Sequence, residues 1–330
     1  MGRKNKMRRE RRSFGPSRMT KARYILSMIL VVMFVLLGGT ARAEQANSDS
    51  EKGGDSGEVI HPEHGSLAEV GKKLSDPTSN VWALFTEFDL SFSSGDINQG
   101  AANPGFRMIF QPIMPFPLYG TGDDAWRFIT RPIIPVFFSQ PIPTGFNENN
   151  NLAGLGDIQL PMLVSPAAEH WILALGPTWL FPTATHDVLG KQQWGVGPAG
   201  VLGYKTKEWT GGIFPQWTFG IGGWNDNKTP TVNNLNMLYF FFYNLPNAWQ
   251  VGTNPSITYD NNGTPGNRWN VPIGITVSKT TQIDGVPVKF QIGIEYSVIK
   301  QSTYGQQAMI KFNIIPVIKS LVQNPIFGGM

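Results

Sequence analysis

Few residues of this chain could carry out chemistry. There is no cysteine, which excludes disulfides, thiolate metal sites, thiol catalysis and a lipoprotein anchor. The four histidines, at positions 61, 64, 170 and 186, have no spacing typical of a metal site. A Ser-His catalytic pair would need a histidine at a strand or its rim, and only His186, near Thr183 and Thr185, comes close. We therefore expect no enzymatic activity, no metal and no cofactor.

One glycine pattern resembles a nucleotide-binding loop by spacing alone. The segment from Gly195 to Gly200 fits G-x-G-x-x-G. A dinucleotide-binding loop must follow a strand and begin a helix, and Pro198 with the alternation around it provides neither. We interpret these glycines as small residues on one face of a strand that make room for a bulky neighbouring side chain.

The remaining candidates are charged residues on the polar face of alternating segments. A charge that faces lipid at the bilayer midplane costs about 2 to 4 kcal/mol for Arg or Lys, so in a membrane barrel these side chains should point inward. They would then either line a permeation path and set its selectivity, or form a structural network that fills a narrow barrel. The lumen-lining candidates are Glu87, Asp89, Arg107, Arg127, Arg131, Asp157, Lys289, Glu295 and Lys311.

The segments that must position these charges alternate with period two from Val81 to about Ile315. Between Val288 and Val298, for example, apolar even positions alternate with polar odd ones. The segments are longer than the five or six residues usual in soluble sheets and match the roughly 9 to 11 residues that cross a membrane at a tilt. We expect twelve strands, an even number as in bacterial single-chain barrels. They lie near 81–92, 105–117, 125–137, 153–165, 170–182, 193–205, 209–222, 234–244, 248–260, 268–279, 286–299 and 304–315.

The connections and the strand interiors support a barrel, with exceptions. Long Asn-rich connections such as Phe138 to Leu152 alternate with short ones, but the segments from Thr280 to Gly285 and from Lys300 to Thr303 depart from this rule. Trp and Tyr near segment ends, including Trp82, suggest aromatic girdles. Prolines inside the predicted strands fall on the lipid-facing parity and remove ladder donors, which bulges could absorb. These prolines are Pro112, Pro132, Pro177, Pro198, Pro215 and Pro255.

The N-terminus reads as an export signal. Residues 1–23 carry ten Lys or Arg, and a short apolar run and Ala41-Arg42-Ala43 follow, so residues 1–43 are predicted to be a signal peptide. Residues 44–79 are predicted to be a polar tether with one short periplasmic helix, which begins at a capping box from Ser66 to Glu69. The barrel should occupy residues 80–315 and a C-terminal tail residues 316–330.

Removal of the signal reverses the charge of the chain. Residues 1–43 hold 11 of the 27 basic and 1 of the 23 acidic residues, so 16 basic and 22 acidic residues remain and the net charge is −6. The basic excess therefore belongs to the export signal, and we expect no nucleic-acid partner.

Four stretches together resemble a known family. They are Gly154 to Ile158, Gly176 to Thr185, Gly190 to Pro198 and Trp269 to Gly274. In this order and spacing they are similar to bacterial outer-membrane proteins catalogued as MetA-pathway phenol-degradation proteins, also labelled neuromedin U-like transporters. The resemblance covers roughly residues 66–315. It implies a β-barrel and a role in outer-membrane transport, and it carries no catalytic residues.

These observations predict an all-β protein, an antiparallel transmembrane β-barrel with a short N-terminal helix, in the outer membrane of a Gram-negative bacterium. The expected partners are outer-membrane lipid, the barrel-assembly machinery and an unknown small solute. The expected function is a passive channel or transporter for small solutes, with aromatic or hydrophobic compounds among the candidates. Two alternatives stay open: a structural or surface-binding barrel with a plugged lumen, and a soluble lectin-like sandwich.

Overall fold

The computed structural model describes residues 65–120, 125–145, 148–223, 232–322 and 324–327. The chain divides into Met1–Gly57 and Glu58–Met330, and every described residue belongs to the second unit. The predicted signal peptide therefore lies outside the described residues. Within the described ranges, no helix is long and apolar enough to cross a membrane.

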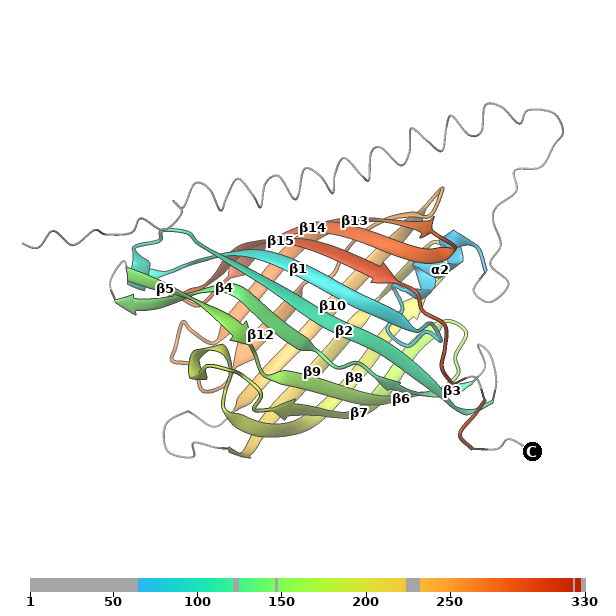
Figure 1. Ribbon diagram of the computed structural model, residues 1–330, viewed down its shortest axis with the longest axis horizontal. Coiled ribbons are helices and arrows are strands. Elements are labelled where there is room, and N and C mark those ends of the chain that lie inside the picture. Colours follow the sequence, from blue (N-terminus) through green and yellow to red (C-terminus); the bar gives the residue numbers. More distant parts are fainter. Residues whose placement is uncertain (1–64, 121–124, 146–147, 224–231, 323, 328–330) are drawn as a thin grey trace, which may run out of the picture. The chain divides into compact units, whose positions relative to one another are not determined.

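In the described part of the chain, fifteen strand segments form one antiparallel sheet, and β1 closes it by pairing with both β15 and β2 (Figure 1). Three strands of the barrel are each built from two consecutive segments, so the barrel has the predicted twelve strands, and the all-β prediction is confirmed. The segments are β1 (Ala83–Ser94), β2 (Asn103–Tyr119), β3 (Trp126–Thr130), β4 (Ile134–Gly145), β5 (Glu148–Leu155), β6 (Ile158–Ser165), β7 (Trp171–Phe181), β8 (Gln193–Lys205), β9 (Trp209–Gly223), β10 (Asn233–Leu245), β11 (Trp249–Thr253), β12 (Ser256–Asp260), β13 (Trp269–Ile283), β14 (Val286–Ile299) and β15 (Gly305–Pro316).

The two faces of the barrel wall differ in polarity as the alternation predicts. On the outside, Leu175 is 72% exposed and Ile294 is 59% exposed, whereas Asp89 and Lys289 on the inside are almost completely buried. A closed sheet leaves no unpaired edge, and an apolar exterior is the surface that lipid requires. This fold excludes the soluble sandwich, and it is the fold expected of a barrel that spans a membrane.

The two ends of the barrel have different connections. The α2 end carries the helix α2 (Leu67–Lys73), the start of β1 and the end of β15, and the opposite loop end carries two short 3-10 helices, η1 (Asp96–Asn98) and η3 (Asp187–Leu189) (Figure 1). The predicted exception at 280–285 is wrong, because β13 continues to Ile283 and only Asp284 and Gly285 form the turn. Both have positive φ, 48° and 83°, as a tight Asp-Gly hairpin turn requires.

A hairpin replaces one predicted loop. Residues 138–152 were expected to be an external connection, but β4 runs to Gly145 and β5 starts again at Glu148. The segment β5 pairs with β4 alone. The polar composition of this segment suggested a loop, whereas backbone pairing with β4 holds it as a strand that extends the barrel wall at the loop end.

The strand prolines interrupt the ladder at few places. Pro132 lies between β3 and β4, and Pro255 lies between β11 and β12, so two of the three divided strands break beside a proline. Pro177 on β7 lies directly opposite Pro198 on β8. The pairing of each strand with its other neighbour is also interrupted at this level. No residue of β6 pairs with Pro177, and no residue of β9 pairs with Pro198. The missing donors are therefore concentrated in one small region of the wall.

Aromatic side chains form arcs near both ends of the barrel. At the α2 end, Tyr204 lies 5.2 Å from Trp171 and 5.8 Å from Trp209 between ring centroids. At the loop end, Tyr259 and Trp269 lie 4.5 Å apart. These positions match the interfacial girdles of membrane barrels.

Trp82 does not belong to a girdle, which corrects the sequence prediction. It is only 4% exposed, and its indole N–H donates a hydrogen bond of 2.8 Å to the carbonyl of Pro115. The reason is that residues after β15 lie beside it, since the amide of Ile318 donates to the carbonyl of Trp82.

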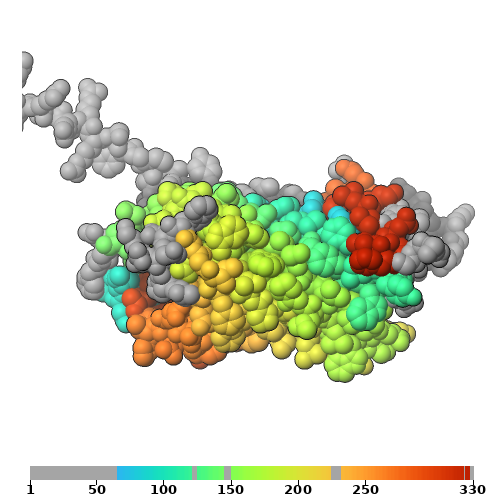
Figure 2. All heavy atoms as spheres, turned by 90° about the horizontal axis from the view of Figure 1, so that it is seen from below, coloured from blue at the N-terminus to red at the C-terminus, as the bar shows by residue number. Residues whose placement is uncertain are grey.

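The described part of the C-terminal tail is fastened to the barrel. After β15, Val317 forms a bridge with Ala83, and further on the amides of Ile326 and Phe327 donate to the carbonyls of Pro117 and Leu118 at the end of β2. Figure 2 shows these red C-terminal residues lying against the blue-green part of the barrel. The tail thus runs from the last strand past β1 to β2.

Candidate functional site

The barrel encloses one large cavity of about 780 Å³. Its lining begins at Leu74, Ser75 and Pro77, which follow α2, and reaches Leu189 and Lys191 in the loop after β7. The cavity therefore extends from the α2 end of the barrel to the loop end. Its two walls differ, because one carries charged side chains and the facing wall combines uncharged polar residues with apolar ones such as Phe214 and Phe240.

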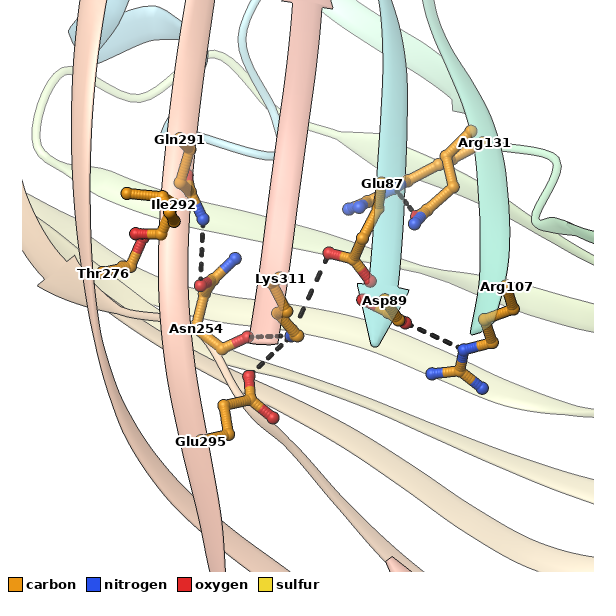
Figure 3. A network of polar contacts seen from close by, with 11 residues as sticks. Glu87, Asp89, Arg107, Arg131, Asn254, Thr276, Gln291, Ile292, Glu295 and Lys311 are labelled. Carbon is orange, nitrogen blue, oxygen red and sulfur yellow. Dashed lines mark hydrogen bonds and ion pairs between the residues drawn. The ribbon is translucent and has the colours of Figure 1, made fainter. Parts of the chain in front are cut away.

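The charged wall is a belt of opposite charges on four neighbouring strands. Along β14, β15, β1 and β2 the signs alternate: Glu295 is followed by Lys311, then by Glu87 and Asp89, then by Arg107. We call these five residues the charge belt. Figure 3 shows their side chains pointing toward one another from adjacent strands.

The distances within the charge belt are those of direct ion pairs. Lys311 Nζ lies 2.6 Å from Glu295 Oε1 and 4.0 Å from Glu87 Oε2, and Arg107 Nε lies 2.8 Å from Asp89 Oδ2. Asp89 is completely buried, whereas the Arg107 side chain is 32% exposed to the cavity. The belt thus combines buried carboxylates with a guanidinium that a solute could reach.

The facing wall carries an apolar cluster that the alternation pattern did not reveal. In β6 to β10, inward positions toward the α2 end are hydrophobic and packed together. In the segment from Trp171 to Leu175 both faces are apolar, so the sequence shows no polar lumen side there. The cluster consists of Leu163, Ile172, Ala174, Ala199, Val201, Phe214, Phe240 and Phe242, with Leu238 against it.

Helix α2 lies in the mouth of the barrel. Its predicted capping box is present, since Glu69 N donates to Ser66 Oγ and Ser66 N donates to a carboxylate oxygen of Glu69. Val70 is completely buried with Val81 and Val317, and Leu74 packs on the inward face of β1 and β15. The helix, which the sequence places in a tether ahead of the barrel, thus contacts the inside of the wall.

Lys289 on β14 fastens this segment. Its Nζ donates to Ser75 Oγ at 2.7 Å, to Gln250 Oε1 at 2.6 Å and to the carbonyl of Gly71 at 3.4 Å. The ammonium also lies 4.8 Å from the ring centroid of Phe242. Every one of these partners is uncharged, so hydrogen bonds and a cation–π contact hold the lysine in place. We call this set of contacts the Lys289 latch.

An ion pair fastens the chain just after α2. Asp76 Oδ2 lies 2.7 Å from Lys205 Nζ at the end of β8, and Asp76 Oδ1 accepts from the amide and hydroxyl of Thr78. Burial, and next the positive charge of Lys205, lowers the pKa of Lys72 in the last turn of α2. The mouth is therefore narrowed by a segment with two separate polar attachments.

At the loop end, residues 182–191 narrow the cavity. Asp157 was predicted to line the lumen, and it does, but its carboxylate also accepts from the amides of Ala184 at 3.0 Å and Lys191 at 2.5 Å. It thereby anchors this loop. Lys191 reaches Asp260 at the end of β12, with 3.7 Å between Nζ and Oδ2. This ion pair connects the residues before β8 with the end of β12, two strands that are separated in the sheet by β9 and β10.

The structure divides the nine predicted lumen residues into several groups. Five form the charge belt, Lys289 forms the latch, Asp157 anchors a loop and Arg131 lines the cavity beside the belt. Arg127 is 8% exposed and lies outside the cavity lining. Most of the other polar lining residues, such as Gln216 and Asn254, carry no charge, so a prediction based on charged side chains omitted them. The charged lining residues Lys191 and Asp260 were also missed, because they lie in or beside the connections at the loop end.

Among the described residues, no group of three His, Asp or Glu side chains is placed to hold a metal ion.

Comparisons with known proteins agree at the level of fold. No protein-family model and no curated protein sequence matches this chain. Among solved structures, an outer-membrane channel from Pseudomonas putida F1 superimposes with a TM-score of 0.54 at 10% identity, covering 72% of this chain and 96% of that chain. A bacterial polysaccharide outer-membrane secretin (TM-score 0.33, 10% identity, 73% and 99% covered) and a BenF-like porin from Pseudomonas fluorescens Pf-5 (TM-score 0.24, 6% identity, 72% and 98% covered) are more distant. The chain has the fold of outer-membrane barrels.

Proposed function

We propose that this protein is a passive channel for small solutes in the outer membrane, and that it belongs to the MetA-pathway-like barrel family that its sequence resembles. The observation that carries the proposal is the cavity, which reaches from the α2 segment to the loop after β7 inside a twelve-stranded barrel. A barrel of this size lies between those that side chains fill and those that are open pores. A passage with selective walls is the function that such a lumen supports best.

The two walls of the cavity favour solutes with both a polar and an apolar part. The charge belt offers ion pairs and hydrogen bonds on one side, and the cluster around Phe214 and Phe240 offers an apolar surface on the other. Aromatic or hydrophobic compounds that carry a polar group fit this division. We propose transport without chemical conversion.

Planar-bilayer recording of the purified full-length protein tests the proposal. We expect stepwise conductance that depends on lumen side chains, so that a bulky substitution in the middle of the cavity, such as Gln216→Trp, lowers it severalfold. The matched control is Leu175→Trp, which changes an exposed residue on the outside of the wall. A protein that inserts, runs as a folded barrel on unheated gels and still conducts no ions or solutes would contradict a channel.

A specific observation also favours a second function. Both ends of the cavity are narrowed, at one end by α2 with the Lys289 latch and at the other by residues 182–191. A barrel that keeps these segments in place permanently would be a plugged structural or surface-binding protein. The two functions differ in one measurable property, because only the channel requires the α2 segment to move or to leave a path beside it.

A further inference from the structure

We infer that the α2 half of the cavity binds a small amphipathic monoanion, a carboxylate with a short apolar tail, and that Arg131 holds its carboxylate. This inference rests on the proposed channel function and names the class of solute that the same lumen would take. It follows from the position of Arg131 in the cavity, from the absence, among the described residues, of an ion pair to its guanidinium, and from the apolar surfaces on both sides of it.

Arg131 lies where the wall is interrupted between β3 and β4. Its backbone amide donates to the carbonyl of Pro161, and the following Pro132 prevents the strand from continuing regularly. In the cavity, Arg131 Nε donates to Gln111 Oε1 at 2.9 Å, and the guanidinium carbon lies 5.4 Å from the ring centroid of Phe85. The side chain is thus oriented by a neutral amide and an aromatic face.

The level of this site follows from the strand register. Gln111 is paired with Phe85, which lies two residues nearer the α2 end than Glu87. Lys289 is paired with Ile315, the inward residue beside Phe85 on β15. Arg131 and the Lys289 latch therefore lie at about the same level, between the charge belt and α2. Figure 3 shows Arg131 beside Glu87, on the side of the belt away from Arg107.

Glu87 is the carboxylate beside Arg131 (Figure 3), but no ion pair joins the two, because the carboxylate of Glu87 lies 4.0 Å from Lys311 instead. Arg107 has Asp89, and Lys311 has Glu295. Across the described ranges, by contrast, no carboxylate oxygen lies within 4.0 Å of a side-chain nitrogen of Arg131 or Lys289. A guanidinium that lines a cavity without a carboxylate in contact can bind an anion there. Both residues line the cavity, but the ammonium of Lys289 is almost fully buried and already bonded to Ser75 and Gln250, so Arg131 is the cation that a bound anion can contact.

Apolar side chains lie on both sides of Arg131. On its own wall, Leu74, Phe85 and Ile113 pack together. The facing wall presents Phe240 and Phe242, and the 4.8 Å contact of Phe242 with Lys289 places them at the same level. A tail of a few methylene groups between these walls would leave the carboxylate at Arg131. Arginine is suited to this role, because its planar guanidinium matches the two oxygens of a carboxylate.

The test measures binding at equilibrium and does not depend on conductance. The full-length protein in lipid nanodiscs is titrated calorimetrically with acetate, butanoate and hexanoate, and with hexanol and hexylammonium, against empty nanodiscs. We expect affinity to rise about fourfold for each added methylene that the apolar walls cover. We expect hexanol to bind at least tenfold more weakly than hexanoate and hexylammonium not to bind. Equal binding of hexanol and hexanoate would overturn the inference.

Substitutions of Arg131 test whether this residue binds the carboxylate. Arg131→Gln should weaken hexanoate at least tenfold and leave hexanol unchanged, and Arg131→Lys should restore part of the affinity because the charge returns without the planar fork. Lys207→Gln, in the exposed turn between β8 and β9, is the matched control and should bind as the wild type does. Unchanged hexanoate binding in Arg131→Gln would refute the site. If Arg131→Gln does not fold, the affinity of Arg131→Lys for hexanoate and the ligand series on the wild-type protein still test the site.

The outcome is separable from that of the proposed function. Hexanoate binding that depends on Arg131, in a protein that shows no flux in bilayers, would leave the site standing and remove the channel. Conductance without selective hexanoate binding would leave the channel standing and remove this inference.

Discussion

Lys289 Nζ lies 2.7 Å from Ser75 Oγ and 2.6 Å from Gln250 Oε1, so one ammonium joins the barrel wall to the segment that follows α2. Because none of its partners is charged, separation of the segment from the wall leaves no opposite charge behind. These hydrogen bonds hold the segment in the narrowed mouth without an ion pair. The predictions below begin with this contact.

Replacement of Lys289 should loosen the mouth. Hydrogen bonds to a charged group contribute about 1.5 to 3 kcal/mol, so Lys289→Met should raise the population of conducting states roughly tenfold or more. Single-channel open probability in planar bilayers measures this. Lys279→Met is the matched control, because Lys279 on the neighbouring β13 lies over Trp249 and bonds to the carbonyl of Asn247. Equal open probabilities in the two variants would contradict a latch.

A disulfide should show whether α2 must move. A Cβ atom placed on Gly71 would lie 3.5 Å from Cβ of Thr280, within the range of disulfides. The native chain contains no cysteine, so Gly71→Cys with Thr280→Cys introduces a single possible bridge. We expect low conductance in the oxidised protein and recovery on reduction, with each single-cysteine variant unaffected by reductant. Full conductance of the oxidised protein would mean that the path passes beside a stationary helix.

The charge belt should set ion preference with a predictable sign. Lys311→Gln removes the cation that lies between Glu87 and Glu295, so the lumen should favour cations more than the wild type does. Glu295→Gln should shift preference toward anions. The reversal potential under a KCl gradient reports both, and the two shifts should have opposite signs. Shifts of the same sign would show that the belt does not face the ion path.

Gly197 should tolerate substitution less well than Gly200 on the same strand. A Cβ atom at Gly197 would overlap the carbonyl oxygen of Trp217 on β9, whereas one at Gly200 would lie 3.2 Å from the carbonyl oxygen of Ala174. Overpacking of this kind costs about 1 to 3 kcal/mol. We therefore expect Gly197→Ala to unfold at lower urea concentration than Gly200→Ala, followed by the gel mobility of unheated samples. Equal midpoints would contradict close strand approach as the reason for the glycine.

That glycine also shows how far sequence reasoning reaches. The alternation around Gly197 correctly predicts a strand and excludes a nucleotide loop. It does not reveal that the nearest neighbour is backbone, because the distance between two strands depends on the partner strand as well. We expected a bulky side chain beside the glycines. The nearest atom to a Cβ at Gly195 is a methyl group of Thr218, and at Gly197 it is the carbonyl oxygen of Trp217, with the ring of Phe219 next at 3.3 Å.

Only part of the candidate site could be predicted from the sequence. The alternation of polar and apolar residues puts Glu87, Asp89 and Lys311 on the polar face of their strands. Because charged side chains are unfavourable in lipid, this face must point into the barrel, so the charge belt could be predicted from the sequence. The Lys289 latch could not, because it joins β14 to a helix more than 200 residues earlier in the chain. The apolar cluster around Phe240 was also missed, since segments that are apolar on both faces show no alternation.

The charge belt has a further consequence, for the assembly of the barrel. It spans the seam where the first and last strands meet, since Asp89 on β1 lies directly opposite Lys311 on β15. A slip of the seam by one residue would turn these charges toward lipid, at a cost of about 2 to 4 kcal/mol for the lysine alone. Lys311 and Glu87, 4.0 Å apart across this seam, therefore favour the correct alignment of two strands that are far apart in the sequence.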